Sequence, residues 1–180
     1  MYLPKEMFFT RGCGHHKDKL TSFELALRDA GIAHFNIVRV SSIFPPYCKI
    51  ISKQEGLARL SPGQIVFTVL SDISTNECGR MIASSIGAAI PMDNSLHGYL
   101  SEYHEYGKTE EEAGDYAEDI AAYMLATILE GSKDEIDWDA NKEIWKMNNK
   151  IVKTQNIAVA TKGRQNGNWT TALTGAILIG

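Results

Sequence analysis

The chain has 180 residues, of which 44% are apolar and 22% charged, and its formal net charge is −4. These values fit one globular domain with a hydrophobic core, and they give no support for a nucleic-acid partner or a membrane span. The first residues lack the charged-then-apolar order of a signal peptide. The cysteines Cys13, Cys48 and Cys78 are odd in number and widely spaced, which indicates free thiols in the cytoplasm.

In the first half of the chain, hydrophobic patterning predicts three strands and one helix: strands over 7–10, 35–41 and 64–71, and a helix over 22–31. The stretch 11–19 is polar and contains glycine, so we expect a loop there. Thr21 is expected to cap the helix, and Gly31 occupies the usual place of a C-terminal glycine. Pro45 and Pro46 forbid a helix and favour an extended bend.

In the second half, the pattern predicts three strands and one long amphipathic helix: strands over 98–106, 150–161 and 170–179, and a helix from 109 to about 130. Thr109 and Glu112 have the spacing of a capping box at the start of this helix. The small residues of 80–91 suit a buried strand but leave a helix open. The polar stretch 132–149 resembles an inserted surface segment. Because strands outnumber helices, we expect an α+β sandwich of layers.

Two adjacent serines, Ser41 and Ser42, stand between an apolar strand-like run and two prolines. The hydroxyl of Ser42 can attack the carbonyl carbon of Ser41 and move the acyl group from nitrogen to oxygen. Elimination across Ser42 then releases the Ser41 carboxyl group, and hydrolysis with loss of ammonia leaves a pyruvoyl group. Backbone strain is the expected driver. On these two residues alone, a serine pair that satisfies local backbone groups is the commoner explanation.

The wider sequence resembles the pyruvoyl-dependent arginine decarboxylase family. Several separate stretches match it in order: residues 20–27, 30–46, 88–91, 95–98 and 101–103. The resemblance implies a four-layer α/β/β/α sandwich, and one domain cleaved into residues 1–41 (the β subunit) and 42–180 (the α subunit). It also implies a homotrimer of cleaved protomers or a dimer of trimers, with active sites between neighbours.

The resemblance further implies that Ser42 becomes a covalent pyruvoyl cofactor. L-Arginine would form a Schiff base with this group, lose carbon dioxide and leave as agmatine, with the group acting as the electron sink that pyridoxal phosphate provides elsewhere. The carbanion must then be protonated, and a carboxylic acid suits this step. Glu102 matches the family's proton donor, although an exposed strand glutamate is the alternative. Agmatine formation would serve polyamine synthesis or acid resistance.

Four more residues match substrate-binding positions of the family. Glu24 stands where the family places an aspartate for the guanidinium, so the charge is kept on a side chain one methylene longer. Asn36 matches an asparagine that could polarise the Ser41 carbonyl or orient the substrate. Leu27 and Ile43 would form apolar walls of the pocket. Each also has an alternative interpretation without a function. Glu24 could be a solvated helix residue and Asn36 a turn residue at a strand end, and Leu27 and Ile43 could belong to the core.

We expect no metal, since Cys13, His15 and His16 fit no standard zinc spacing. Two other functions stay open at this point. One is the same chemistry on another amino acid, although the Glu24 carboxylate disfavours an acidic substrate. The other is an uncleaved, non-catalytic relative that binds a small cationic amine.

Overall fold

The computed structural model describes residues 2–130 and 151–180, and within these ranges nine strands form two sheets. The five-stranded sheet has the order β2-β5-β9-β1-β4, and the four-stranded sheet has the order β3-β7-β6-β8. The elements are β1 (Glu6–His16), α1 (Lys19–Asp29), β2 (Asn36–Arg39), β3 (Ile43–Phe44), β4 (Lys49–Ile50), α2 (Lys53–Leu57), β5 (Ile65–Thr75), β6 (Met81–Pro91), β7 (Gly98–Tyr106), α3 (Glu110–Glu130), β8 (Ile151–Lys162) and β9 (Trp169–Ile179).

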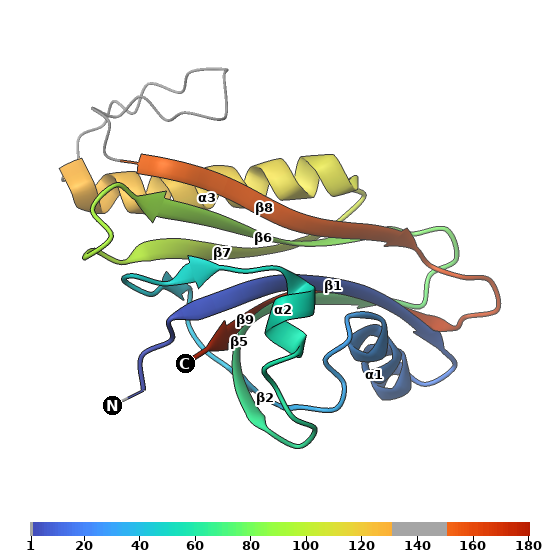
Figure 1. Ribbon diagram of the computed structural model, residues 1–180. Helices are drawn as coiled ribbons and strands as arrows, with labels where there is room; N and C mark the ends of the chain where they lie inside the picture. Colours follow the sequence, from blue (N-terminus) through green and yellow to red (C-terminus); the bar gives the residue numbers. More distant parts are fainter. Residues whose placement is uncertain (1, 131–150) are drawn as a thin grey trace.

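The two sheets pack face to face, and helices cover both outer sides, the long α3 on one and the shorter α1 on the other (Figure 1). Helix α3 lies on the four-stranded sheet and α1 on the five-stranded sheet. Between the sheets, Val69 and Ala176 of one sheet pack in the same buried cluster as Ile86 and Leu100 of the other. The expected four-layer α/β/β/α sandwich is confirmed. Among the helices of the described ranges, none is long and apolar enough to cross a membrane.

Strand β1 is much longer than predicted, so the expected loop over 11–19 was wrong. Its Gly12 is a packing residue: a Cβ there would lie 2.3 Å from the carbonyl oxygen of Ala26 in α1. A Cβ at Gly14 would lie 2.0 Å from the Ser22 oxygen. These glycines let the helix backbone approach the strand, whereas the sequence prediction treated them as turn residues. Helix α1 consequently starts earlier than expected, and its cap is Asp18, which accepts from the Thr21 N–H at 2.9 Å.

The ambiguous segment 80–91 forms strand β6, which is buried on both faces. Its Gly87 faces α3, where an added Cβ would lie 2.2 Å from the backbone of Ala117. Two-sided burial removes the polar-apolar alternation by which a strand is usually recognised, and this explains the ambiguity. The predicted capping box of α3 is confirmed, since the Thr109 Oγ1 accepts from the Glu112 N–H and the Glu112 carboxylate accepts from the Thr109 N–H.

The remaining differences concern short elements and strand ends. Strand β2 ends at Arg39, β5 continues to Thr75, and the short elements β3, β4 and α2 had no expected counterpart. Gly31 has φ of 77° after the last turn of α1, as its C-terminal position predicted. The predicted insertion over 132–149 lies outside the described residues.

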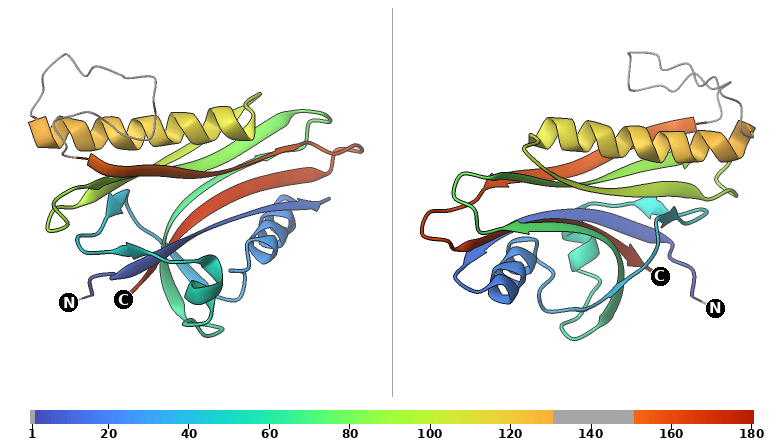
Figure 2. Two further views of the ribbon diagram at one scale, coloured as in Figure 1. Left: turned by 45° about the horizontal axis from the view of Figure 1, so that its top comes forward. Right: turned by 180° about the vertical axis from the view of Figure 1, so that it is seen from behind.

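Beyond β2 the chain leaves the five-stranded sheet and crosses to the four-stranded sheet, where it forms β3 (Figure 2). Strand β2 pairs in parallel with β5, and β3 pairs antiparallel with β7. The crossing consists of Val40, Ser41 and Ser42. The serine pair therefore lies at the edge of the sandwich, on the connection between its two inner layers.

Candidate active site

The peptide bond between Ser41 and Ser42 is held from both sheets. Upstream, the Val40 N–H donates to the Thr68 carbonyl of β5 at 3.1 Å. Downstream, the Leu100 N–H of β7 donates to the Ser42 carbonyl at 2.8 Å. Ser41 is exposed and Ser42 half-buried. The bond therefore spans the gap between two anchors that belong to different layers.

A tight turn centres on Ser42. The Ile43 N–H donates to the Ser41 carbonyl oxygen at 3.0 Å, which closes a three-residue turn. This hydrogen bond draws electron density from the carbonyl carbon that the Ser42 hydroxyl would attack. The strain expected from the sequence does not take the form of a left-handed backbone at either serine, because the non-glycine residues with positive φ in the described ranges are Tyr47 and Asn166.

Glu102 lies at the same edge as the serine pair. It shares a strand face with Leu100, because side chains two positions apart point to the same side. Leu100 is buried between the sheets, whereas the Glu102 side chain at the open edge is exposed. The register pairs Glu102 with Ile86 of β6, another residue of the inner core. A carboxyl group thus stands on the inner face of β7, two residues from the N–H that holds Ser42.

The neighbouring Tyr103 points to the opposite side, where its ring packs 4.4 Å from that of Tyr116 in α3, centroid to centroid. Burial raises the pKa of the Tyr103 phenol, so this group is neutral at physiological pH. Tyr103 faces α3, so Glu102 is the acidic group that β7 presents to the inner face near Ser42.

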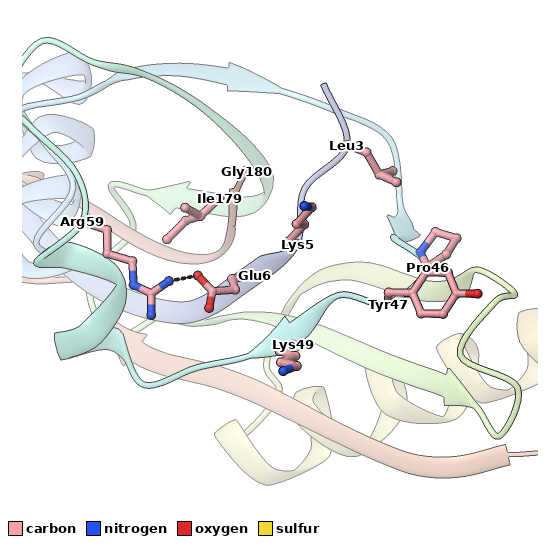
Figure 3. Close-up of a pocket in the computed structure, with 9 residues that line it drawn as sticks. All are labelled: Leu3, Lys5, Glu6, Pro46, Tyr47, Lys49, Arg59, Ile179 and Gly180. Atoms are coloured by element: carbon pink, nitrogen blue, oxygen red, sulfur yellow. Dashed lines mark hydrogen bonds and ion pairs between the residues drawn. The ribbon is translucent and has the colours of Figure 1, made fainter. Parts of the chain in front are cut away.

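A mostly apolar cavity of about 440 Å³ borders the serine pair. Ile43 and Ser41 line it. The other lining residues are Tyr2, Leu3, Pro4, Val40, Pro45, Pro46, Phe67 and Leu178. A larger cavity of about 780 Å³ lies beyond Pro46, between the two ends of the chain, and contains none of the predicted site residues (Figure 3).

Three of the predicted substrate-binding residues lie away from the serine pair in the structure. Glu24 is on α1, where its Oε1 accepts from the Arg28 Nε at 2.6 Å. Leu27, also on α1, packs against the core under that helix. Asn36 starts β2, and its Nδ2 donates to the Gly63 carbonyl at 2.6 Å, at the end of β2 far from Ser41. Helix α1 covers the outer face of the five-stranded sheet, so one chain does not bring Glu24 and Leu27 to Glu102.

The Cys13, His15 and His16 group does not form a cluster. Alternation along β1 places His16 on the face opposite to the other two, and its Nδ1 accepts from the Asp18 N–H at 3.0 Å. His15 Nδ1 lies 3.0 Å from the Thr170 Oγ1, and burial raises the pKa of the Cys13 thiol to about 11. Within the described residues, no group of three or more potential ligands could hold a metal ion.

The sequence did not reveal the groups that hold the segment of the serine pair. The Leu100 and Ile43 N–H groups are backbone donors, and no residue type marks them. Ser71 of β5 donates from its Oγ to the Tyr103 carbonyl at 2.8 Å and so joins the two sheets beside Glu102. An isolated serine in a predicted strand gives no signal for such a contact, which depends on how the sheets pack.

Comparison with known proteins identifies the family of the chain. The sequence model of the pyruvoyl-dependent arginine decarboxylase family matches residues 6–180. The chain belongs to this family. It is 55% identical over 179 residues to the probable pyruvoyl-dependent arginine decarboxylase of Chloroherpeton thalassium, covering 99% of this chain and 98% of the relative. It is 54% identical over 177 residues to the pyruvoyl-dependent arginine decarboxylase of Nitrosopumilus maritimus, covering 97% and 96%. The corresponding protein of Thermoplasma volcanium is 50% identical over 178 residues, covering 99% and 97%.

The pyruvoyl-dependent arginine decarboxylase family requires a pyruvoyl group, and the serine pair fits its formation. Ser42 is half-buried, its backbone is held on both sides, and the carbonyl that precedes it already accepts a hydrogen bond from Ile43. Ser42 is therefore well placed to supply the cofactor from the chain itself, beside the Glu102 carboxyl group.

Proposed function

We propose that the chain cleaves itself between Ser41 and Ser42 and then decarboxylates L-arginine to agmatine and carbon dioxide. Residues 1–41 and 42–180 would be the two fragments, and Ser42 would become the pyruvoyl terminus of the second. The observation that carries the proposal is the anchoring of the serine pair: Leu100 holds the Ser42 carbonyl, and the Ile43 N–H polarises the Ser41 carbonyl.

Self-cleavage would proceed in three steps: acyl transfer, elimination and hydrolysis. The Ser42 Oγ attacks the Ser41 carbonyl carbon, the oxyanion is stabilised by the Ile43 N–H, and the C–N bond breaks to give an ester and a free amine. Removal of the Ser42 α-proton then expels the Ser41 carboxylate and leaves a dehydroalanine. Its imine tautomer takes up one water and releases ammonia, which leaves a ketone next to the Ser42 carbonyl. No external oxidant is needed.

The two fragments would stay together after cleavage. Residues 1–41 contain β1, which pairs over all eleven of its residues with β9 of the second fragment. Helix α1 packs on the same two strands. The buried Phe8 and Ala26 of the first fragment share a cluster with Leu173 and Ile177 of the second. Cleavage of one surface peptide bond therefore leaves the core intact.

When formed, the pyruvoyl group supplies an electron sink for the carbanion left by decarboxylation. The chain's own residues do the rest. Glu102 delivers a proton to the substrate α-carbon from the inner face of β7. The apolar wall that includes Ile43 lies beside the methylene stem of arginine. Glu24 binds the guanidinium through a charge-assisted pair.

Since one chain keeps Glu24 apart from Ser42, the complete site requires a second copy, and we propose a homotrimer or a dimer of such trimers. In this assembly α1 of one protomer faces the serine edge of its neighbour. Leu27 and Asn36 would be contributed in the same way as Glu24, from the neighbour.

Intact-mass analysis with a carbonyl reagent tests the proposal. Purified protein should give two fragments that break between Ser41 and Ser42, and borohydride should add two hydrogens to the second fragment alone. Arginine should then be converted to agmatine, and histidine or aspartate should not. One full-length chain that binds agmatine without turnover would instead identify an uncleaved amine-binding relative and refute the proposal.

A further inference from the structure

An ion pair between Arg39 and Asp72 lies directly upstream of the serine pair. The register of β2 places Arg39 opposite Thr68. Its Nη2 nevertheless donates to the Asp72 Oδ1 at 2.5 Å, four residues farther along β5. Within the described residues, β2 pairs with β5 only as far as Thr68. The guanidinium therefore extends the contact between these two segments past the point where their backbone pairing ends.

The same part of β5 is also fastened to the strand that carries Glu102. Ser71, the residue before Asp72, donates from its Oγ to the Tyr103 carbonyl at 2.8 Å. The ion pair thus joins β2 to β5 within the five-stranded sheet, and the next residue of β5 joins that sheet to β7. Through these two adjacent residues of β5, a position two residues before Ser41 is connected to a position one residue after Glu102.

The upstream anchor of the serine pair is otherwise weak. Strand β2 has four residues, lies at the edge of its sheet, and is exposed at three of its positions. The downstream anchor is firmer, because Ser42 is bound to β7, a strand paired over eight residues with β6. A movement of Ser41 relative to Ser42 would change the approach of the hydroxyl to the carbonyl carbon. Misplacement of reacting atoms by about 1 Å can slow a reaction by about a hundredfold.

We propose that Arg39 and Asp72 are positioning residues for self-cleavage, which hold the Ser41 carbonyl in place against the Ser42 hydroxyl. This proposal rests on the cleavage proposed above. It assigns no contact with arginine to either residue. Loss of the pair should therefore slow the formation of the pyruvoyl group without changing turnover at sites that already contain one.

Three variants test this role: Arg39→Gln, Asp72→Asn, and the charge reversal Arg39→Asp with Asp72→Arg. Freshly synthesised precursor is sampled over time, and the uncut fraction is measured by denaturing electrophoresis and intact mass. Each single variant should process about three- to tenfold more slowly than the wild type. The double variant should recover most of the lost rate, because the opposite charges face each other again. Turnover per mole of reactive carbonyl should be unchanged in all three.

The Arg59–Glu6 pair provides a matched control (Figure 3). It also joins distant segments, and its side chains are 49% and 24% exposed, close to the 55% and 26% of Arg39 and Asp72. Arg59→Gln should lower the urea midpoint by about as much as Arg39→Gln does, but it should process at the wild-type rate.

Wild-type processing rates in both single variants would overturn the proposal. So would a double variant as slow as the single variants, or an equal delay in Arg59→Gln, since either result reports only a general loss of stability. If the wild type and all variants stay uncut, the proposed cleavage itself is refuted. This outcome differs from a failure of the positioning role, in which the wild type still cleaves.

Discussion

The backbone N–H of Leu100 binds the carbonyl of Ser42 at 2.8 Å and joins the serine pair to the strand that carries Glu102. Since Leu100 and Glu102 share one face of β7, their Cα atoms lie about 6.6 Å apart along the strand. One hydrogen bond therefore sets both the position of the residue that we propose as the cofactor precursor and its distance from a carboxyl group. Self-cleavage and decarboxylation would use the same edge of the sandwich.

Ser42→Ala should remain a single chain of 180 residues without a reactive carbonyl group. The substitution removes the hydroxyl that would attack Ser41 and leaves the hydrogen bonds of Ile43 and Leu100 in place, so the fold should persist. Intact mass after prolonged incubation and an assay for agmatine check this outcome. Normal turnover of arginine by this variant would remove Ser42 from the mechanism.

Glu102→Gln should still cleave but decarboxylate poorly. The amide keeps the size of the side chain but cannot donate a carboxylic proton, so we expect kcat to fall about a hundredfold or more. The fragments and the bound carbonyl are measured first, so that turnover is expressed per mole of cofactor. Asp115, an acidic residue of α3 away from the serine edge, provides a control in Asp115→Asn. A wild-type kcat in Glu102→Gln would exclude it as the proton donor.

The elements of the fold that the sequence predicts correctly are those marked by residues at a fixed local spacing. The capping box of Thr109 and Glu112 and the terminal Gly31 have fixed spacings, and both were found where expected. Gly12 and Gly14 were misread, because a glycine that admits a helix is indistinguishable in sequence from a glycine that allows a turn. The double-sided burial of β6 removed its alternation. Both effects depend on packing between layers, which the periodicity of one segment does not contain.

The candidate site also has a part that the sequence predicts and a part that depends on packing. Ser41 and Ser42 could be singled out from the sequence because the chemistry joins neighbours in the chain. The roles of Glu102 and Glu24 came from the family resemblance. The contact of Ser71 with Tyr103 arises only when the two sheets meet, and the ion pair of Arg39 with Asp72 only when β2 pairs with β5. No spacing along the chain encodes those contacts.

Mixing two variants, one that binds arginine weakly and one that lacks the cofactor, tests whether the site is shared between copies. Glu24→Gln should raise KM for arginine about tenfold or more, since it removes a charged partner of the guanidinium. Ser42→Ala has no cofactor. A mixed oligomer joins the intact Ser42 of one protomer to the intact Glu24 of the other, so co-refolding should restore a site with the wild-type KM.

The control mixture contains Glu24→Gln together with a chain that carries both substitutions. No interface in that mixture has an intact Glu24, so it should stay at the raised KM. Equal activity in the two mixtures would show that Glu24 acts within its own chain or has no part in binding.

Stability should decline as the pH falls from 7.5 to 5.5. Burial and the nearby Arg164 lower the pKa of His15 below its usual value of 6.5, so the folded state binds a proton less readily than the unfolded state. The resulting loss of stability is absent above about pH 6.5 and grows below it. Urea midpoints at the two pH values measure it. His15→Gln should reduce the difference between them, and an unchanged difference would assign the effect to other groups.

Gly87→Ala should destabilise the protein by about 1–3 kcal/mol, because overpacking a close contact forces the backbone to shift. The added Cβ would lie 2.2 Å from the carbonyl carbon of Ala117, and a helix backbone cannot move aside as a flexible side chain can. Gly175→Ala in β9 is the matched control, since a Cβ there meets side-chain atoms at an ordinary 3.4–3.5 Å. Urea unfolding should separate the two variants clearly. Equal midpoints would mean that α3 can move away from β6, and that the close approach at Gly87 does not fix the distance between these layers.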